Sequence, residues 1–122
     1  MYVYSLAIME GAAFEVRLIL EEFRRQGMSI ERTITMSGGA ARSKLWSSLV
    51  GYICDNDVFL TDETDTPALG AAMIAAVNSG AYIDYEACSR VFVKKKPLVL
   101  NNPELRDFYS DKFNRYRDWC VL

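Results

Sequence analysis

The first long segment of the chain has the spacing of an amphipathic helix. From Leu6 to Gln26 there is no proline, and apolar side chains recur every three or four residues among charged ones. Gly27 suits the left-handed turn that ends many helices, and Arg24 and Arg25 favour the negative end of the helix dipole. The pattern therefore predicts one long helix that ends near Gln26.

The next segments alternate between the patterns of strands and helices. Residues 32–36 alternate polar and apolar side chains and stop at Ser37-Gly38-Gly39, which predicts a strand that enters a tight turn. Residues 41–53 carry apolar side chains at helical spacing. The Asp55-Asn56-Asp57 cluster then predicts a turn into a short strand at 58–60. Together these segments predict a βαβ unit with two parallel strands.

The last third of the sequence predicts helices and one extended segment. Pro67 suits the first turn of a helix that ends at Gly80. A short helix is expected at 84–89, an extended segment at 90–100, and a final helix after Pro103. Two parallel strands are few, because a sheet has about five or six on average. The expected fold is therefore an α/β layer whose early strands are missing from this sequence.

Composition limits the chemistry that this chain can perform. With 122 residues, 51% hydrophobic and 25% charged, residues 1–122 are expected to form a single globular domain. Histidine is absent, which excludes Ser-His and Cys-His nucleophiles and the commonest zinc ligand. Three widely spaced cysteines predict neither a disulfide framework nor a thiolate metal site, and they fit a reducing cytoplasm.

Charge and hydropathy also bear on partners. The formal net charge of -2 argues against a surface that is basic throughout and binds nucleic acid. The apolar opening is interrupted by Glu10 and Gly11, so a buried helix is expected there rather than a membrane span. The basic run Lys94–Lys96 lies beside Pro97 and has two interpretations, a phosphate-binding group or a charged edge that discourages strand pairing.

Two segments are candidates for ligand binding. In Ser37–Ser43, glycines between a strand and a helix let the backbone turn sharply and approach a ligand, and free N–H groups at the helix start suit a phosphate. The same residues also suit a tight turn without a ligand. In Thr66–Ala72, Gly70 and the alanines either admit a flat ligand or pack one helix closely on another. The carboxylates of residues 55–65 are interpreted as a solvated loop, without a catalytic role.

Three motifs appear in order along residues 5–118. They are Glu10-Gly11 with Phe14, the segment Ser37-Gly38-Gly39-Ala40-Ala41-Arg42-Ser43 with Trp46, and Leu69-Gly70-Ala71-Ala72 with Ala75-Ala76 and Gly80-Ala81-Tyr82. Pro97 and the terminal helix with Tyr109 and Tyr116 also fit. With these motifs the sequence resembles the C-terminal half of the FGGY family of carbohydrate kinases, most closely its xylulose kinase branch.

The resemblance implies the C-terminal half of an actin-like, ribonuclease H-like ATPase domain, with parallel strands flanked by helices. It implies that Gly38, Gly39, Ala40 and Ala41 lie along the ribose and α-phosphate of ATP, with Ser43 nearby. Pro67 and Gly70 are implied to approach the adenine.

The resemblance also implies how the work is divided in an intact kinase. The intact enzyme uses ATP with Mg²⁺ to phosphorylate a hydroxyl of a sugar, a xylulose-like ketose or a polyol. The catalytic aspartate and the sugar pocket belong to an N-terminal domain upstream of the matched region. No residue of this chain is therefore assigned a catalytic role, and the chain alone is expected to be inactive.

Several positions depart from the family pattern and motivate a second hypothesis. Ala40 replaces a glycine, Ser48 stands where glutamine is frequent, and Gly51-Tyr52 replaces an Ala-Asp pair. Ala40 is acceptable only if its φ is negative, because a positive φ costs a residue with a Cβ roughly 1 kcal/mol. The alternative is a catalytically inactive interaction or oligomerisation module with a decayed nucleotide site. Homo-oligomers are expected under either hypothesis, because missing strands leave an open sheet edge.

Overall fold

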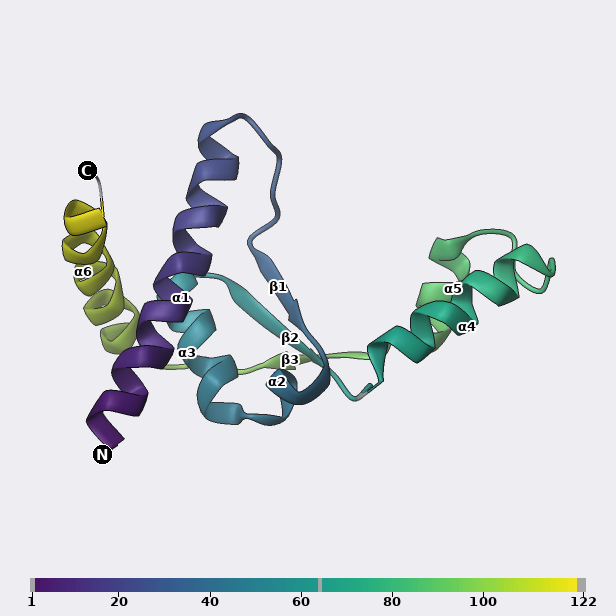
Figure 1. The fold of residues 1–122 in the computed structure, drawn as a ribbon, viewed down its shortest axis with the longest axis horizontal. Coiled ribbons are helices and arrows are strands. Elements are labelled where there is room, and N and C mark those ends of the chain that lie inside the picture. Colours follow the sequence, from purple (N-terminus) through teal and green to yellow (C-terminus); the bar gives the residue numbers. More distant parts are fainter. Residues whose placement is uncertain (1, 64, 121–122) are drawn as a thin grey trace.

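The computed structural model describes residues 2–63 and 65–120 and shows helices around one small sheet (Figure 1). The elements in chain order are α1 (Tyr2–Arg25), β1 (Thr33–Met36), α2 (Gly38–Arg42), α3 (Lys44–Cys54), β2 (Asp57–Thr61), α4 (Thr66–Asn78), α5 (Tyr85–Phe92), β3 (Lys95–Leu98) and α6 (Pro103–Cys120).

The sheet has the strand order β1-β2-β3 and is mixed. β1 and β2 are parallel, with Ile34 opposite Val58, and this confirms the predicted βαβ unit. β3 pairs antiparallel to β2, with Leu98 opposite Val58. A pairing between segments this distant in sequence leaves no local pattern, so the prediction of parallel strands alone missed it.

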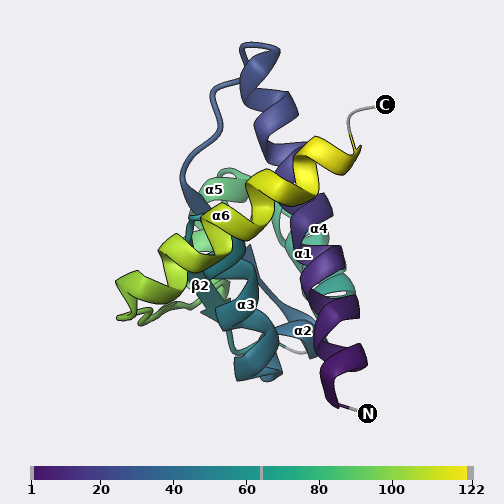
Figure 2. The same ribbon diagram turned by 90° about the vertical axis from the view of Figure 1, so that its left-hand side faces the viewer.

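The hydrophobic core lies between the sheet and three helices, α1, α3 and α6, which form a layer on one side of the molecule (Figure 2). Phe14 of α1, Ile53 of α3 and Phe113 of α6 are all buried in one cluster. Gly51 of α3 permits the close approach of this helix to the sheet, because a Cβ there would overlap the Leu100 side chain and lie 2.9 Å from Val58 Cγ2.

The prediction of one helix over residues 41–53 is wrong, because two helices occupy this part of the chain. The chain forms α2, leaves helical geometry at Ser43 (φ -85°, ψ 98°) and begins α3 at Lys44. The Ser43 hydroxyl accepts a hydrogen bond from the Trp46 N–H at 3.2 Å. A serine in this position caps a new helix, since its side chain replaces the missing carbonyl partner of an N-terminal N–H.

The end of the first helix is confirmed. α1 ends at Arg25, and Gly27 follows with a φ of +83°. The Gly27 N–H donates to the Arg24 carbonyl and the Met28 N–H to the Phe23 carbonyl, both at 3.0 Å. The helix begins at Tyr2 rather than at Leu6, and residues 2–8 are exposed, so the expectation of a buried helix over the apolar opening is wrong there.

Helices α4 and α5 pack on each other apart from the other helices (Figure 1). The expected extended segment at 90–100 is partly wrong, because α5 continues to Phe92 before β3 begins. The Phe92 ring meets the Tyr82 ring edge to face at 5.7 Å, a contact that favours the longer helix. Within the described ranges, no helix is both long enough and apolar enough to cross a membrane.

Candidate functional site

The two candidate segments follow neighbouring parallel strands. The carboxyl ends of parallel strands meet at one edge of a sheet, and there α2 follows β1 while Asp62 and Glu63 follow β2. The Gly38 N–H donates a hydrogen bond to the Glu63 carbonyl at 3.2 Å. The structure therefore joins the glycine segment to the loop that leads into α4.

Gly38 and Gly39 begin a helix and face open space. Gly38 has a φ of +65°, a conformation that residues with a Cβ rarely adopt. A Cβ on Gly38 or on Gly39 would meet no atom of the described chain within 4 Å. The space beside both glycines is therefore open, with Gly39 exposed and Gly38 half-buried.

Ala40 fits its position without strain. It lies within α2, and Asp55 is the one non-glycine residue with a positive φ among those that the structure describes. The Ala40 carbonyl accepts hydrogen bonds from the Ser43 N–H at 3.3 Å and from the Ser47 hydroxyl at 3.4 Å. Ala41 is half-buried in the same short helix. Alanine in place of glycine is therefore compatible with this loop.

Ser43 lies at the far end of the segment, where its hydroxyl caps α3. The side chain is exposed, and its oxygen already accepts a hydrogen bond within the chain. Its role in the described fold is thus to separate α2 from α3.

Pro67 and Gly70 lie on α4, which leads away from the sheet (Figure 1). Pro67 is exposed in the first turn, as predicted, and Gly70 is half-buried one turn further on. A Cβ on Gly70 would meet no described atom within 4 Å. Both residues are connected to the Gly38–Glu63 contact by the short loop before α4.

The acidic side chains of that loop have structural partners. The Asp65 carboxylate accepts from the Ala68 N–H at 3.1 Å and caps α4, and the Glu63 carboxylate accepts from the Asp65 N–H at 2.9 Å. Asp62 forms an ion pair with Lys96 at 2.5 Å. Over residues 2–63 and 65–120, His, Cys, Asp and Glu form no group of three or more that suits a metal ion.

Two features at this edge of the sheet were missed by sequence reasoning. Thr61, the last residue of β2, is 9% exposed, and its buried hydroxyl has no hydrogen-bond partner within the described chain. Such an orphaned polar group is unusual, because buried hydroxyls normally find partners. Lys95 lies opposite Thr61 in the register of β3, so part of the basic run lies at the same edge.

A family model, the C-terminal domain of the FGGY family of carbohydrate kinases, matches residues 2–79. This range covers the glycine segment, the loop after β2 and all of α4. The chain belongs to the FGGY family of carbohydrate kinases. The resemblance carried by the three motifs is thereby confirmed.

Curated relatives of this FGGY chain include sugar kinases from several bacteria. It is 30% identical over 112 residues to a xylulose kinase of Bacillus subtilis (strain 168), a match that covers 92% of the chain and 22% of the relative. A ribulokinase of Mycolicibacterium smegmatis is 32% identical over 117 residues, a match that covers 93% of this chain and 21% of the ribulokinase. The chain thus spans about a fifth of the length of these relatives.

Solved structures of the same family share the fold. A ligand-bound xylulose kinase from Lactobacillus acidophilus matches with a TM-score of 0.75 and 19% identity, over 92% of this chain and 22% of that one. A xylulose kinase from Rhodospirillum rubrum matches with a TM-score of 0.74 and 20% identity, over 93% and 23%. The expected fold class, part of an actin-like, ribonuclease H-like α/β domain, is confirmed.

Proposed function

We propose that this chain forms the nucleotide-binding portion of an ATP-dependent carbohydrate kinase. The observation that carries the proposal is the contact between the glycine segment after β1 and the segment after β2, at the carboxyl ends of these two strands. There the Gly38 N–H is bonded to the Glu63 carbonyl, and the space that a Cβ on Gly38 or Gly39 would occupy is open. Ligands of α/β sheets commonly bind at this edge of parallel strands. Membership of a kinase family supports a nucleotide as the ligand.

In this proposal the ligand is held mainly by backbone groups. Gly38, Gly39, Ala40 and Ala41 line the ribose and α-phosphate, because small residues allow the main chain to come close. Ser43 shapes this loop through its cap. Pro67 and Gly70 approach the adenine, and the open space over Gly70 supports that assignment.

Lys95 fits an anionic ligand at the same edge by its charge. Mg²⁺ would arrive with the nucleotide phosphates, since the described residues offer no cluster of ligands for it. The metal would neutralise phosphate charge during transfer.

The complete reaction belongs to a longer protein. It transfers the γ-phosphoryl group from ATP to a sugar hydroxyl, the acceptor being a xylulose-like ketose or a polyol. The O–P bond to ADP breaks as the new O–P bond forms. The chain spans about a fifth of its curated relatives, so we assign the sugar pocket and the general base to the N-terminal domain. The isolated chain is then inactive as a kinase.

Calorimetric titration of the 122-residue chain with Mg-ATP and Mg-ADP tests the proposal. We expect saturable binding that Gly39→Val weakens by at least about tenfold, because the added side chain occupies the space that the ligand needs. Gly11→Val on α1 is the matched control, since a Cβ there also meets open space but lies outside the candidate site. Binding that is unchanged by Gly39→Val would refute the assignment.

The alternative function, an interaction or oligomerisation module with a decayed nucleotide site, is favoured by a different observation. Tyr2, Val3, Tyr4 and Ile8 are exposed at the start of α1, and no residue of α4 is buried. Large exposed apolar areas typically mark contact surfaces. Absence of binding up to millimolar nucleotide, together with self-association in sedimentation, would favour this module over the kinase portion.

A further inference from the structure

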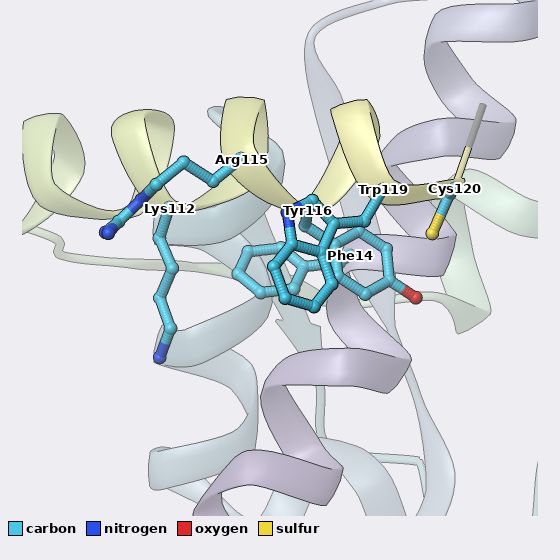
Figure 3. Close-up of a pocket in the computed structure, with 6 residues that line it drawn as sticks. All are labelled: Phe14, Lys112, Arg115, Tyr116, Trp119 and Cys120. Carbon is cyan, nitrogen blue, oxygen red and sulfur yellow. The ribbon is translucent and has the colours of Figure 1, made fainter.

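A hollow lies where α6 crosses α1, away from the glycine loop. It encloses about 580 Å³ and is lined by Phe14, Lys112, Arg115, Tyr116, Trp119 and Cys120 (Figure 3). None of these residues belongs to the candidate nucleotide site. The hollow therefore calls for an explanation of its own.

Aromatic rings form one part of this hollow. The Phe14 and Tyr116 rings lie 5.0 Å apart between centroids with their planes 31° from parallel, and the Tyr116 hydroxyl donates to Glu15 at 2.5 Å. These contacts hold the Tyr116 ring in place. Trp119, one turn further along α6, is 87% exposed. Its indole offers a large flat face at the rim, which suits stacking against a ring of a ligand.

Two cationic side chains, Lys112 and Arg115, extend on the same side of the rings, with their charged ends apart from each other (Figure 3). Lys112 is already neutralised, because its Nζ lies 2.5 Å from the buried Glu10 carboxylate. Arg115 forms no ion pair with any residue between 2 and 63 or between 65 and 120. A guanidinium presents paired N–H groups that match a carboxylate. The hollow thus combines an apolar wall with one available cation.

We propose that this hollow binds a small ligand that carries a flat apolar ring and a single carboxylate. The ring lies against Trp119, Tyr116 and Phe14, and the carboxylate pairs with Arg115. The volume lies within the roughly 300–1,000 Å³ of small-molecule sites, and three aromatic residues with two cationic ones match the apolar walls and few polar groups of such sites. A stable protein partner would instead need about 800 Å² on each side, far more than six residues provide.

The probe for the test is 1-naphthoate, and the 122-residue chain offers two independent readouts. Calorimetry measures its affinity. Alkylation of Cys120 by iodoacetamide measures occupancy, because Cys120 lines the hollow and is exposed, whereas Cys54 and Cys88 are buried. We expect saturable binding and a severalfold slower alkylation of Cys120 when the probe is bound.

Variants separate the two parts of the recognition. Arg115→Gln and Trp119→Ala are each expected to weaken binding by about fivefold, the effect of roughly 1 kcal/mol. Arg90→Gln, an exposed arginine on α5, is the matched control and leaves affinity unchanged. The uncharged 1-naphthamide should bind more weakly than the acid.

Three results would overturn the proposal: no saturable binding at millimolar probe, equal affinity for acid and amide, or wild-type affinity in both α6 variants. The test is separate from that of the nucleotide site. Gly39→Val is expected to weaken Mg-ATP binding while 1-naphthoate binding stays at its wild-type value, so either proposal can fail without the other.

Discussion

Helices α3 and α4 are both rich in apolar residues, yet they have opposite environments. α3 buries seven residues between the sheet, α1 and α6, whereas α4 buries none among the residues that the structure describes. The difference lies in what surrounds each helix rather than in its sequence. α3 is enclosed by elements of this chain, while α4 packs on α5 alone to any large extent. An apolar helix sequence thus indicates that the helix tends to be buried, but it does not say which elements bury it.

The same two regions differ in what they are expected to determine, one the stability of the fold and the other ligand binding. The region around α3 supplies the hydrophobic core, and the candidate nucleotide site lies at its border, in α2 and at the start of α4. Changes in the core should therefore affect the free energy of unfolding. Changes around Gly38 or along α4 should affect mainly ligand binding and local order.

The largest expected effect comes from Phe113→Ala. Phe113 is fully buried, packs against Phe14 and lies 4.1 Å beneath the Arg17 guanidinium, so its loss leaves a cavity. We expect a decrease of about 3–5 kcal/mol in the free energy of unfolding, measured by urea titration. Phe108→Ala, an exposed phenylalanine on the same helix, should cost well under half of that. Equal losses would show that α6 does not pack as described.

A pair of glycine substitutions sharpens the comparison. Gly51→Ala in α3 should lower stability by about 1–3 kcal/mol, because the new methyl group meets Val58 and Leu100. The methyl group added by Gly70→Ala in α4 meets no described atom. This substitution should leave the free energy of unfolding unchanged or raise it by up to about 1 kcal/mol, because alanine favours helices. Thermal denaturation of both variants measures the difference, and a destabilised Gly70→Ala would contradict the open environment of α4.

Alkaline pH should destabilise the packed region through buried weak acids. Burial, with a hydrogen bond to Glu10, raises the pKa of Tyr109 to about 12 from its ordinary 10. Burial raises the pKa of the Cys54 thiol to about 11 from 9. The folded state keeps both protons longer than the unfolded chain, so their stabilisation is complete below pH 9. It is lost as the pH rises to about 12.

Each group contributes at most about 1.4 kcal/mol per pH unit to that loss. Tyr109→Phe should flatten the decline above pH 10 in unfolding titrations. Tyr85→Phe, at an exposed position of α5, removes no buried hydroxyl and serves as the control. A decline as steep in Tyr109→Phe as in the parent would rule out this origin.

The smallest expected effects compare two helix caps. Ser43 caps α3 and Asp65 caps α4, each by accepting a hydrogen bond from the N–H three residues later. Ser43→Ala should lower global stability by about 1 kcal/mol. Asp65→Ala should mainly increase amide hydrogen exchange in the first turn of α4, with little change in global unfolding. The same global loss in both variants would mean that α4 unfolds together with the core.

Sequence reasoning succeeded where the signal is local. Helical spacing and glycine stops predicted α1, α4 and α6, and the diglycine motif predicted the end of β1, although a short helix rather than a tight turn follows it. The break at Ser43 was missed because apolar spacing continues across it, while a single side-chain cap decides the geometry. The antiparallel pairing of β3 and the Gly38–Glu63 contact join residues far apart in sequence, so no local pattern contains them.

The candidate site divides in the same way. The family motifs identified Gly38, Gly39 and Gly70, since their spacing is recorded in the sequence itself. The buried hydroxyl of Thr61 and the position of Lys95 depend on the strand register, which only the folded chain defines.

The most direct test of the nucleotide assignment is a heteronuclear NMR titration of the ¹⁵N-labelled chain with Mg-ATP. We predict saturable shifts of the backbone amides of Gly38, Gly39, Ala40 and Ala41, together with Gly70, and little change around Trp119. Shifts confined to α6, or none at millimolar nucleotide, would contradict the account.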